Sequence, residues 1–205
     1  MKVKICGITD TETALYAVGA GADAIGFVFA PSRRQIAPQT AKAIIEKLPQ
    51  HVEKVGVFVN EQPGMVEAIA EMCGLTMIQL HGEESPELCR AYTLPVVKAV
   101  GVGSKEDVEG ISHYPVPYLL VDSPKGQRYH GGNGETFDWG LLKEASLQQH
   151  GLILAGGLTA ANVNQAIAAV HPYMVDVSSG VETNGRKDRE KIKQFIQAAK
   201  GVEIQ

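Results

Sequence analysis

Two residues of this chain combine a reactive side chain with a position at the end of an apolar run. Cys6 ends the alternating segment Val3–Cys6, and Asp122 follows Tyr118–Val121. In sheets built from strand–helix units, ligands bind where the strands end. A thiolate there can remove a proton, and a desolvated carboxyl can donate one. The simpler alternatives are a buried, unreactive cysteine and a carboxylate that caps the turn at Ser123.

Two glycine turns near the carboxyl end suggest a site for an anion. Gly156 and Gly157 follow one apolar run, and Ser179 and Gly180 follow the next. Glycine allows the backbone to approach a ligand and to present successive N–H groups to an anion. One such turn would be explained by tight chain reversal alone. Two on neighbouring strands favour a phosphate cup, which barrels commonly form after their last two strands.

Other polar side chains are predicted at the same edge. Arg34, next to Arg33, could hold a carboxylate through its two-pronged guanidinium. His81 and Asp176 also fall at or near strand ends. They are candidate substrate-binding residues, although a structural hydrogen-bonding role explains Asp176 equally well and is the more frequent role of a lone histidine such as His81. Lys98 lies in the middle of a predicted strand, which favours a paired lysine over a Schiff-base nucleophile.

Two glycine patterns resemble nucleotide-binding motifs, but they lack the neighbouring elements or residues that these motifs require. Gly19–Ala24 has the dinucleotide spacing, but it follows a predicted helix and precedes a strand, the reverse of the required order. Gly180–Gly185 has P-loop spacing but is followed by Arg186 and Lys187 instead of Lys-Ser/Thr. The histidines show no metal-ligand spacing, so no metal site is expected.

Composition narrows the class of protein. The chain has 205 residues, 44% of them apolar, 20% charged, and a formal net charge of −4, which argues against a nucleic-acid surface. Its three cysteines (Cys6, Cys73 and Cys89) form no CxxC pair, which indicates reduced thiols and a cytoplasmic setting. No stretch reaches the roughly 18 apolar residues of a membrane span, and no signal sequence is expected.

The elements that must position these residues repeat along the chain as short apolar runs followed by helical stretches. Runs without strict alternation are typical of parallel strands buried on both faces. Eight such units at roughly 25 residues each predict a single-domain (β/α)8 barrel over residues 1–205, near the minimal length for that fold. A doubly wound open sheet stays an alternative. The predicted strands are Val3–Cys6, Ala24–Phe29, Lys54–Val59, Met77–Leu80, Val96–Val100, Tyr118–Val121, Leu152–Ala155 and Met174–Val177.

Capping signals predict where the helices begin. Thr9 with Glu12 forms a capping box, and Ser104 with Asp107 caps a later helix. Ser85-Pro86 predicts an N-cap with proline in the first turn. The sixth unit is irregular, because its glycine-dense loop Ser123–Asp138 is long enough to be functional. The remaining predicted helices are Pro38–Leu48, Pro63–Cys73, Ala160–Val170 and Asp188–Ala199.

Taken together, seven segments resemble the phosphoribosylanthranilate isomerase family. They follow the family's order along nearly the whole chain, and the cysteine opening combined with the serine–glycine ending is highly specific. The segments are Lys4–Thr9, Gly26–Phe29, Gly56–Asn60, Gln79–Glu83, Thr136–Trp139, Leu154–Leu158 and Asp176–Glu182.

The resemblance implies an aldose–ketose isomerase of tryptophan biosynthesis that needs no cofactor or metal. It implies Cys6 as general base, Asp122 as general acid and Arg34 near the anthranilate carboxylate. The glycine turns would hold the phosphate of the small-molecule substrate, and the protein would be a monomer or homodimer. Two alternatives stay open: the related aminoaldose isomerase of histidine synthesis, disfavoured by Cys6 in place of a carboxylate, and a non-catalytic phosphate-binding barrel.

Overall fold

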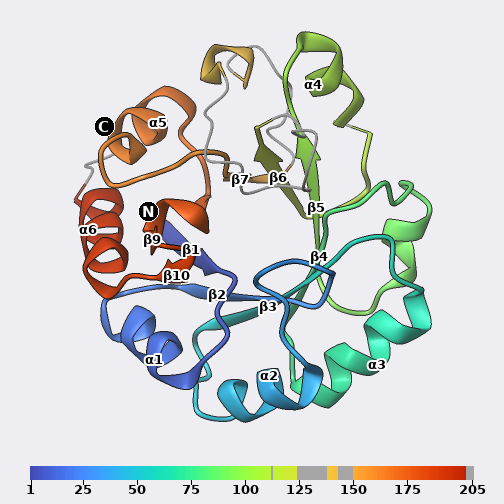
Figure 1. Ribbon diagram of the computed structural model, residues 1–205. Coiled ribbons are helices and arrows are strands. Elements are labelled where there is room, and N and C mark those ends of the chain that lie inside the picture. Colours follow the sequence, from blue (N-terminus) through green and yellow to red (C-terminus); the bar gives the residue numbers. More distant parts are fainter. Residues whose placement is uncertain (112, 124–137, 143–149, 202–205) are drawn as a thin grey trace.

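Eight parallel strands close into a barrel in the order β1 to β8, with helices packed around the outside (Figure 1). The structure is a computed structural model that describes residues 1–111, 113–123, 138–142 and 150–201. Strand β1 pairs with both β2 and β8, which closes the ring and excludes the open sheet. The strands are β1 (Lys2–Cys6), β2 (Ala24–Val28), β3 (Glu53–Phe58), β4 (Met77–Leu80), β5 (Val96–Gly101), β6 (Tyr118–Asp122), β7 (Gly151–Leu154) and β8 (Met174–Val177). The predicted barrel is confirmed.

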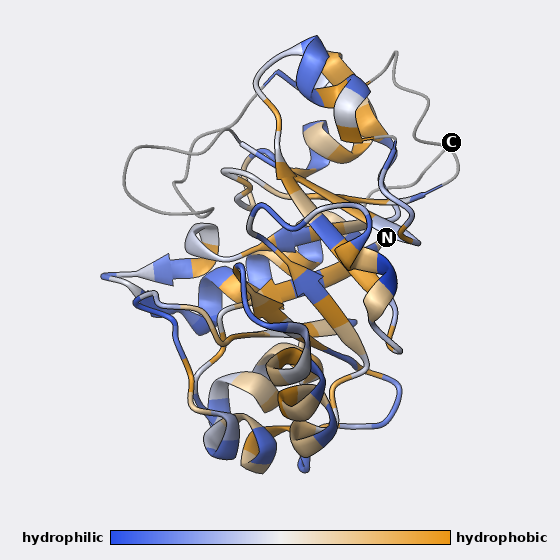
Figure 2. Ribbon diagram, turned by 90° about the vertical axis from the view of Figure 1, so that its right-hand side faces the viewer, coloured by the Kyte–Doolittle hydropathy of each residue, from blue (hydrophilic) through white to orange (hydrophobic). Residues whose placement is uncertain are grey.

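Side chains on the strands divide into two apolar layers. Those pointing inward fill the barrel, among them Val55, Leu120 and Ile153. Those pointing outward, such as Ile5 and Phe27, pack against the helices. Because both faces are buried, the strands are coloured largely as hydrophobic in Figure 2. This double burial explains why the sequence lacks strict alternation.

The helices in the described residues follow most of the predicted positions. The helix predicted over Asp188–Ala199 presents an apolar stripe to the barrel, because Ile192, Phe195, Ile196 and Ala199 are all buried. The helices are α1 (Thr11–Gly19), α2 (Pro38–Ile45), α3 (Pro63–Cys73), α4 (Lys105–Ile111), α5 (Val163–Val170) and α6 (Arg189–Lys200). Short 3-10 turns add η1 (Leu88–Ala91), η2 (Trp139–Leu142) and η3 (Ser179–Val181).

The helix starts predicted at Pro38, Pro63 and Ser104 are correct, whereas those predicted at Thr9 and residue 160 are wrong. Ser104 and Asp107 cap α4 reciprocally, each accepting from the other's backbone N–H, as expected. At α1 the cap is Asp10 instead of Thr9, because the Asp10 carboxylate accepts directly from the Thr13 N–H at 2.8 Å. Helix α5 begins at Val163 and not at residue 160.

The helix predicted from Ser85-Pro86 is also wrong. The Ser85 hydroxyl does accept from the Leu88 N–H at 3.3 Å, but only the 3-10 turn η1 follows. Pro95 starts the approach to β5, and the residue before a proline avoids helical geometry. The segment before Pro95 therefore forms a single 3-10 turn and not an α-helix.

A hairpin that was not predicted from the sequence lies near the mouth of the barrel. Strands β9 (Glu182–Thr183) and β10 (Arg186–Lys187) pair antiparallel across Asn184 and Gly185, which both have positive φ. Asn-Gly is the strongest short signal for such a turn. The glycine-dense loop predicted as functional lies, from residue 124 to 137, outside the described residues.

Candidate active site

Cys6 and Asp122 lie at the carboxyl ends of β1 and β6 and share the same two charged neighbours. Only 7% of Cys6 and 5% of Asp122 are exposed. The charges of Lys4 and Asp176 act on both the thiol and the carboxyl. Closure of the barrel thus brings together, at one mouth, two residues that are 116 positions apart in the sequence.

The Cys6 thiol occupies space that a glycine leaves open. Cys6 is paired in register with Gly26 on β2, and a Cβ atom on Gly26 would lie 2.8 Å from the Cys6 Sγ. Burial raises the pKa of Cys6, while the positive charges of Lys4 and Lys187 oppose that rise. A glycine is therefore required beside a thiol held in this position.

A buried ion pair lies below the thiol. The Lys4 Nζ donates to the Asp176 Oδ1 at 3.0 Å, and the two residues are register partners on β1 and β8. The Lys4 side chain is almost fully enclosed, and burial alone would lower its pKa. Its negative neighbours outweigh that cost, so the pKa of Lys4 is raised and the ammonium stays charged.

Asp122 caps the turn at Ser123 and also lines the pocket at the barrel mouth. Its Oδ1 accepts from the Ser123 N–H at 2.8 Å and from the Ser123 hydroxyl at 3.2 Å, so it does cap the turn. Its Oδ2 lies 3.7 Å from the His81 Nε2. Burial, with the Asp176 charge adding to it, raises the pKa of Asp122 to about 6 despite the Ser123 hydrogen bonds. A carboxyl in this state can carry a proton near neutral pH.

His81 is held from its other ring nitrogen. The Gln79 Nε2 lies 3.0 Å from the His81 Nδ1, so Gln79 donates when that nitrogen is unprotonated. In this tautomer the Nε2 carries the hydrogen and directs it toward Asp122. Gln79 is buried at the inner face of β4 and was not singled out from the sequence.

The two glycine turns line one pocket, as predicted. Gly156 and Gly157 have φ values of +83° and +60°, and a Cβ on Gly180 would overlap the Leu158 carbonyl oxygen. Within the described part of the chain, the Gly156 and Gly157 N–H groups donate no hydrogen bond. Unused N–H groups in consecutive left-handed residues can receive an anion. The pocket is lined by Asp122, Ala155, Gly156, Gly157, Leu158, Asp176, Val177, Ser178, Ser179 and Gly180.

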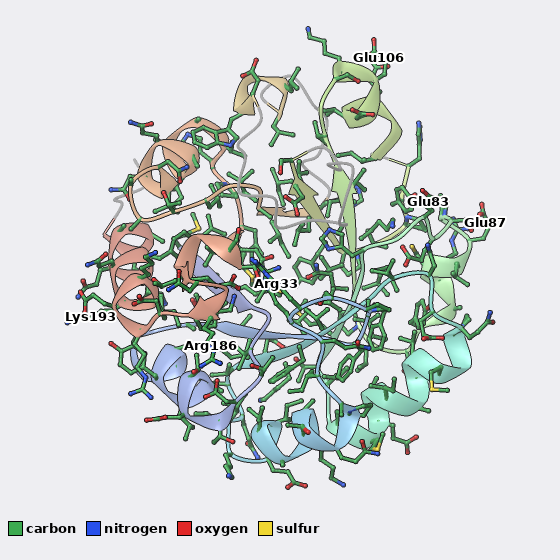
Figure 3. All side chains as sticks on the ribbon, viewed as in Figure 1. Arg33, Glu83, Glu87, Glu106, Arg186 and Lys193 are labelled. Carbon is green, nitrogen blue, oxygen red and sulfur yellow. The ribbon has the colours of Figure 1, made fainter. Side chains whose placement is uncertain are left out.

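Arg34 is held at the mouth by a carboxylate. Its Nε and Nη2 donate to the two Glu182 oxygens at 2.7 and 3.1 Å, and Lys187 and Arg33 contact the same carboxylate. Arg34 and Lys187 lower the pKa of Glu182 against the cost of burying its carboxylate. Figure 3 shows Arg33 near the barrel mouth, with Arg186 on the adjacent hairpin. Arg34 is therefore fixed in orientation by a residue from β9.

Lys98 does not reach this mouth. Its Nζ donates to the Glu84 Oε2 at 2.7 Å and to the Gly82 carbonyl at 2.8 Å, on the outer face of β5. The prediction of a paired lysine is confirmed.

Four residues of the mouth were not identified as functional from the sequence. Lys4 and Gln79 lie two positions from Cys6 and His81, so strand periodicity alone could have placed them on the same inner face. Glu182 and Lys187 had no such signal, because they depend on the hairpin. Among the described residues there is no cluster of three His, Cys, Asp or Glu suited to a metal ion. No helix in that part of the chain is long and apolar enough to cross a membrane.

Known proteins share this sequence and fold. Residues 3–198 match the family model for N-(5'phosphoribosyl)anthranilate (PRA) isomerase. A Bacillus mycoides (strain KBAB4) protein named N-(5'-phosphoribosyl)anthranilate isomerase is 57% identical over 201 residues, which cover 98% of each chain. The crystal structure of phosphoribosyl anthranilate isomerase from Thermotoga maritima is 48% identical with a TM-score of 0.91, over 98% of this chain and 100% of that one. Another crystal structure of such an isomerase, in complex with reduced 1-(o-carboxyphenylamino)-1-deoxyribulose 5-phosphate, is 45% identical with a TM-score of 0.88 over the same shares.

Proposed function

This chain belongs to the N-(5'-phosphoribosyl)anthranilate isomerase family, and from that membership we propose a specific assignment of its catalytic and binding residues. The reaction is the Amadori rearrangement of N-(5-phosphoribosyl)anthranilate to 1-(2-carboxyphenylamino)-1-deoxy-D-ribulose 5-phosphate, a step of tryptophan biosynthesis. The observation that carries the assignment is the meeting of Cys6, Asp122 and an anion pocket at one barrel mouth.

Asp122 acts as the general acid in the first step. Opening the ribose ring breaks the bond between C1 and the ring oxygen, and the anilino nitrogen lone pair forms the iminium. The ring oxygen needs a proton as that bond breaks. A raised pKa of about 6 lets Asp122 supply it. The Ser123 hydrogen bonds keep its carboxyl turned toward the mouth.

Cys6 acts as the general base in the second step. The iminium acidifies the neighbouring C2–H, and the thiolate takes that proton to leave an enolamine. Tautomerisation then places a proton on C1 and leaves the ketone at C2. The inward position of Cys6 at the end of β1 and the open space over Gly26 support this role.

The two anionic ends of the substrate match two separate features. The unused N–H groups of Gly156 and Gly157, together with the turn at Ser179 and Gly180, suit the phosphate. Arg34 suits the anthranilate carboxylate. Glu182 occupies one edge of that guanidinium, so the substrate would use the other edge.

His81 and Asp176 complete the proposed binding site. His81 would donate toward Asp122 or the sugar from its Nε2, and Asp176 would accept from a sugar hydroxyl while holding Lys4. The chemistry consists of proton transfers within one substrate, so the proposal includes no cofactor. The cytoplasmic setting and the monomeric or homodimeric state stay predictions.

The two alternative functions gain no support from the geometry. A histidine-pathway isomerase would be expected to place a second carboxylate at the end of β5, where this chain has Gly101. A non-catalytic phosphate-binding barrel gives no reason for an acid with a raised pKa beside a buried thiol.

A fluorescence assay tests the assignment. Freshly prepared phosphoribosylanthranilate should disappear in the presence of this protein. Cys6→Ser and Asp122→Asn should each lower kcat by about two to four orders of magnitude, because each removes a proton-transfer group. Cys73→Ser, which removes another buried thiol far from the mouth, should retain nearly normal turnover. A Cys6 or Asp122 variant with wild-type turnover would refute the role given to that residue.

A further inference from the structure

Lys4 places a positive charge inside the barrel, directly below the two proposed proton-transfer groups. Only 1% of the residue is exposed. Enclosing an unpaired ammonium costs several kcal/mol, on the order of the penalty for other buried ions. Such a group is retained in a core only where its charge is compensated, and here Asp176 accepts from it at 3.0 Å.

The side chain of Lys4 lies close to the Cys6 thiol on the inner face of the barrel. The absent side chain of Gly26 leaves the space into which both reach, since a Cβ there would lie 2.8 Å from the Cys6 Sγ and 3.2 Å from the Lys4 Cε. Cys6 and Lys4 are two positions apart on β1, so both project to the inner face. The ammonium therefore has two neighbours that can be negative, Asp176 and the Cys6 thiolate.

We propose that Lys4 is a positioning residue of the reaction, whose ammonium group is shared between Asp176 and Cys6 and stabilises the Cys6 thiolate. The catalytic meaning of this inference rests on the proposed role of Cys6 as general base. The electrostatic effect of Lys4 on the thiol does not depend on that role.

The other charges that face Cys6 have defined signs. Asp176 on β8 disfavours the thiolate, whereas Lys187 on β10 favours it from the hairpin side. Burial also disfavours the thiolate and is the largest effect, so the pKa of Cys6 is raised overall. Asp122 on β6 feels Lys4 as well, which lowers the pKa of its carboxyl. Removing the Lys4 charge should thus leave the thiol more protonated throughout its titration range.

The test compares Lys4→Met with the wild type and with Lys54→Met. Lys54 is also a buried lysine, but its Nζ donates to the Pro49 and Gln50 carbonyls on the outer side of β3. The thiolate is followed by its ultraviolet absorbance during a pH titration. Each protein is also titrated in a Cys6→Ser version, so that the difference belongs to Cys6 alone.

The expected result is a loss of thiolate in Lys4→Met of about tenfold or more at a fixed pH, as for removal of an opposite charge nearby. Lys54→Met should titrate as the wild type does. On the same substrate, kcat/KM of Lys4→Met should fall by the same factor near pH 5, where Asp122 carries its proton in both proteins. The thiolate fractions of the two proteins should approach each other at high pH, where Cys6 is deprotonated in both.

A second variant keeps the test decisive if Lys4→Met does not fold. Lys4→Gln removes the same charge but keeps an amide N–H that can donate to Asp176, and it should show the same loss of thiolate. An unchanged Cys6 titration in whichever of these two Lys4 variants folds would overturn the proposal. A shifted titration with unchanged kcat/KM would support the electrostatic role of Lys4 and refute Cys6 as the base.

Discussion

Asp122 and Cys6 each have a pKa raised by burial, and the order of the two values shapes the pH dependence. The acid, with a pKa of about 6, loses its proton before the base does, because the pKa of Cys6 is raised from the higher ordinary value of a thiol. Only a minor fraction of the free enzyme therefore carries a protonated Asp122 and a Cys6 thiolate together. We therefore expect kcat/KM to rise with pH up to the pKa of Asp122, to stay level, and to fall above the pKa of Cys6.

The raised pKa of Asp122 also predicts a cost to stability. The folded protein keeps this proton up to about pH 6, whereas the unfolded chain releases it near the ordinary value of 3.8. The unfolded state is thus favoured as pH rises through this window, and the full cost is present above it. Asp122→Asn should remove the cost and raise the free energy of unfolding at pH 8 by roughly 1–3 kcal/mol.

Urea unfolding at two pH values measures this effect. The gain should shrink to a few tenths of a kcal/mol near pH 3.5, where the carboxyl is protonated in the folded state and mostly protonated in the unfolded state. The Asn amide oxygen can still accept from Ser123, so the capping contact is kept. An Asp122→Asn protein that is less stable than the wild type at pH 8 would contradict this. It would show that the surroundings of Asp122 stabilise its ionised form, so that its pKa is not raised.

Among the elements, the turns after β7 and β8 depend on close approach of their backbones. A side chain at Gly180 would overlap the Leu158 carbonyl oxygen, so one of the two turns would have to move. Gly180→Ala should raise KM by about tenfold or more, equivalent to a loss of roughly 1.4 kcal/mol in binding. Steady-state kinetics measure the change.

Gly110→Ala provides the matched control. Gly110 lies on α4, where a Cβ would meet open space. This variant should keep the wild-type KM and gain about 0.5–1 kcal/mol in stability, because alanine is the better helix former. Equal KM values in the two glycine variants would contradict the phosphate site.

Element bounds could be predicted from the sequence where the signals are local, whereas contacts between distant elements could not. The strand Met77–Leu80 and the helix Pro63–Cys73 occur with the predicted bounds, because apolar runs and proline starts are local signals. Asp10 and Thr9 are both good caps, and local pattern cannot rank them. The contact of Arg34 with Glu182 joins residues 148 positions apart and depends on how the hairpin packs. Such contacts are set by the closed barrel and not by the local sequence.

For the molecule as a whole, closure depends on β1 pairing with β8 while α6 covers that junction. Phe195 and Ile192 are fully buried on α6, which packs against β1 (Figure 1). Phe195→Ala should lower the free energy of unfolding by about 3–5 kcal/mol, through lost burial and the cavity left behind. The exposed Lys193 on the same helix offers a control, and Lys193→Ala should change stability by no more than about 0.5 kcal/mol.

Denaturant unfolding followed by circular dichroism measures both variants of α6. The Phe195→Ala protein that remains folded should retain its turnover, since this side chain does not reach the mouth. A small stability change, within the range of the Lys193→Ala protein, would mean that α6 does not hold the barrel closed.

The central claim is that Cys6 and Asp122 act on one sugar whose phosphate is held by the two glycine turns. A crystal structure of this protein with reduced 1-(o-carboxyphenylamino)-1-deoxyribulose 5-phosphate tests it most directly. The expected result is the Cys6 Sγ within roughly 3–4 Å of C2, the Asp122 carboxyl within hydrogen-bond reach of a sugar oxygen, and the phosphate on the Gly156–Gly157 amides. A phosphate bound elsewhere, or a C2 atom out of reach of Cys6, would contradict it.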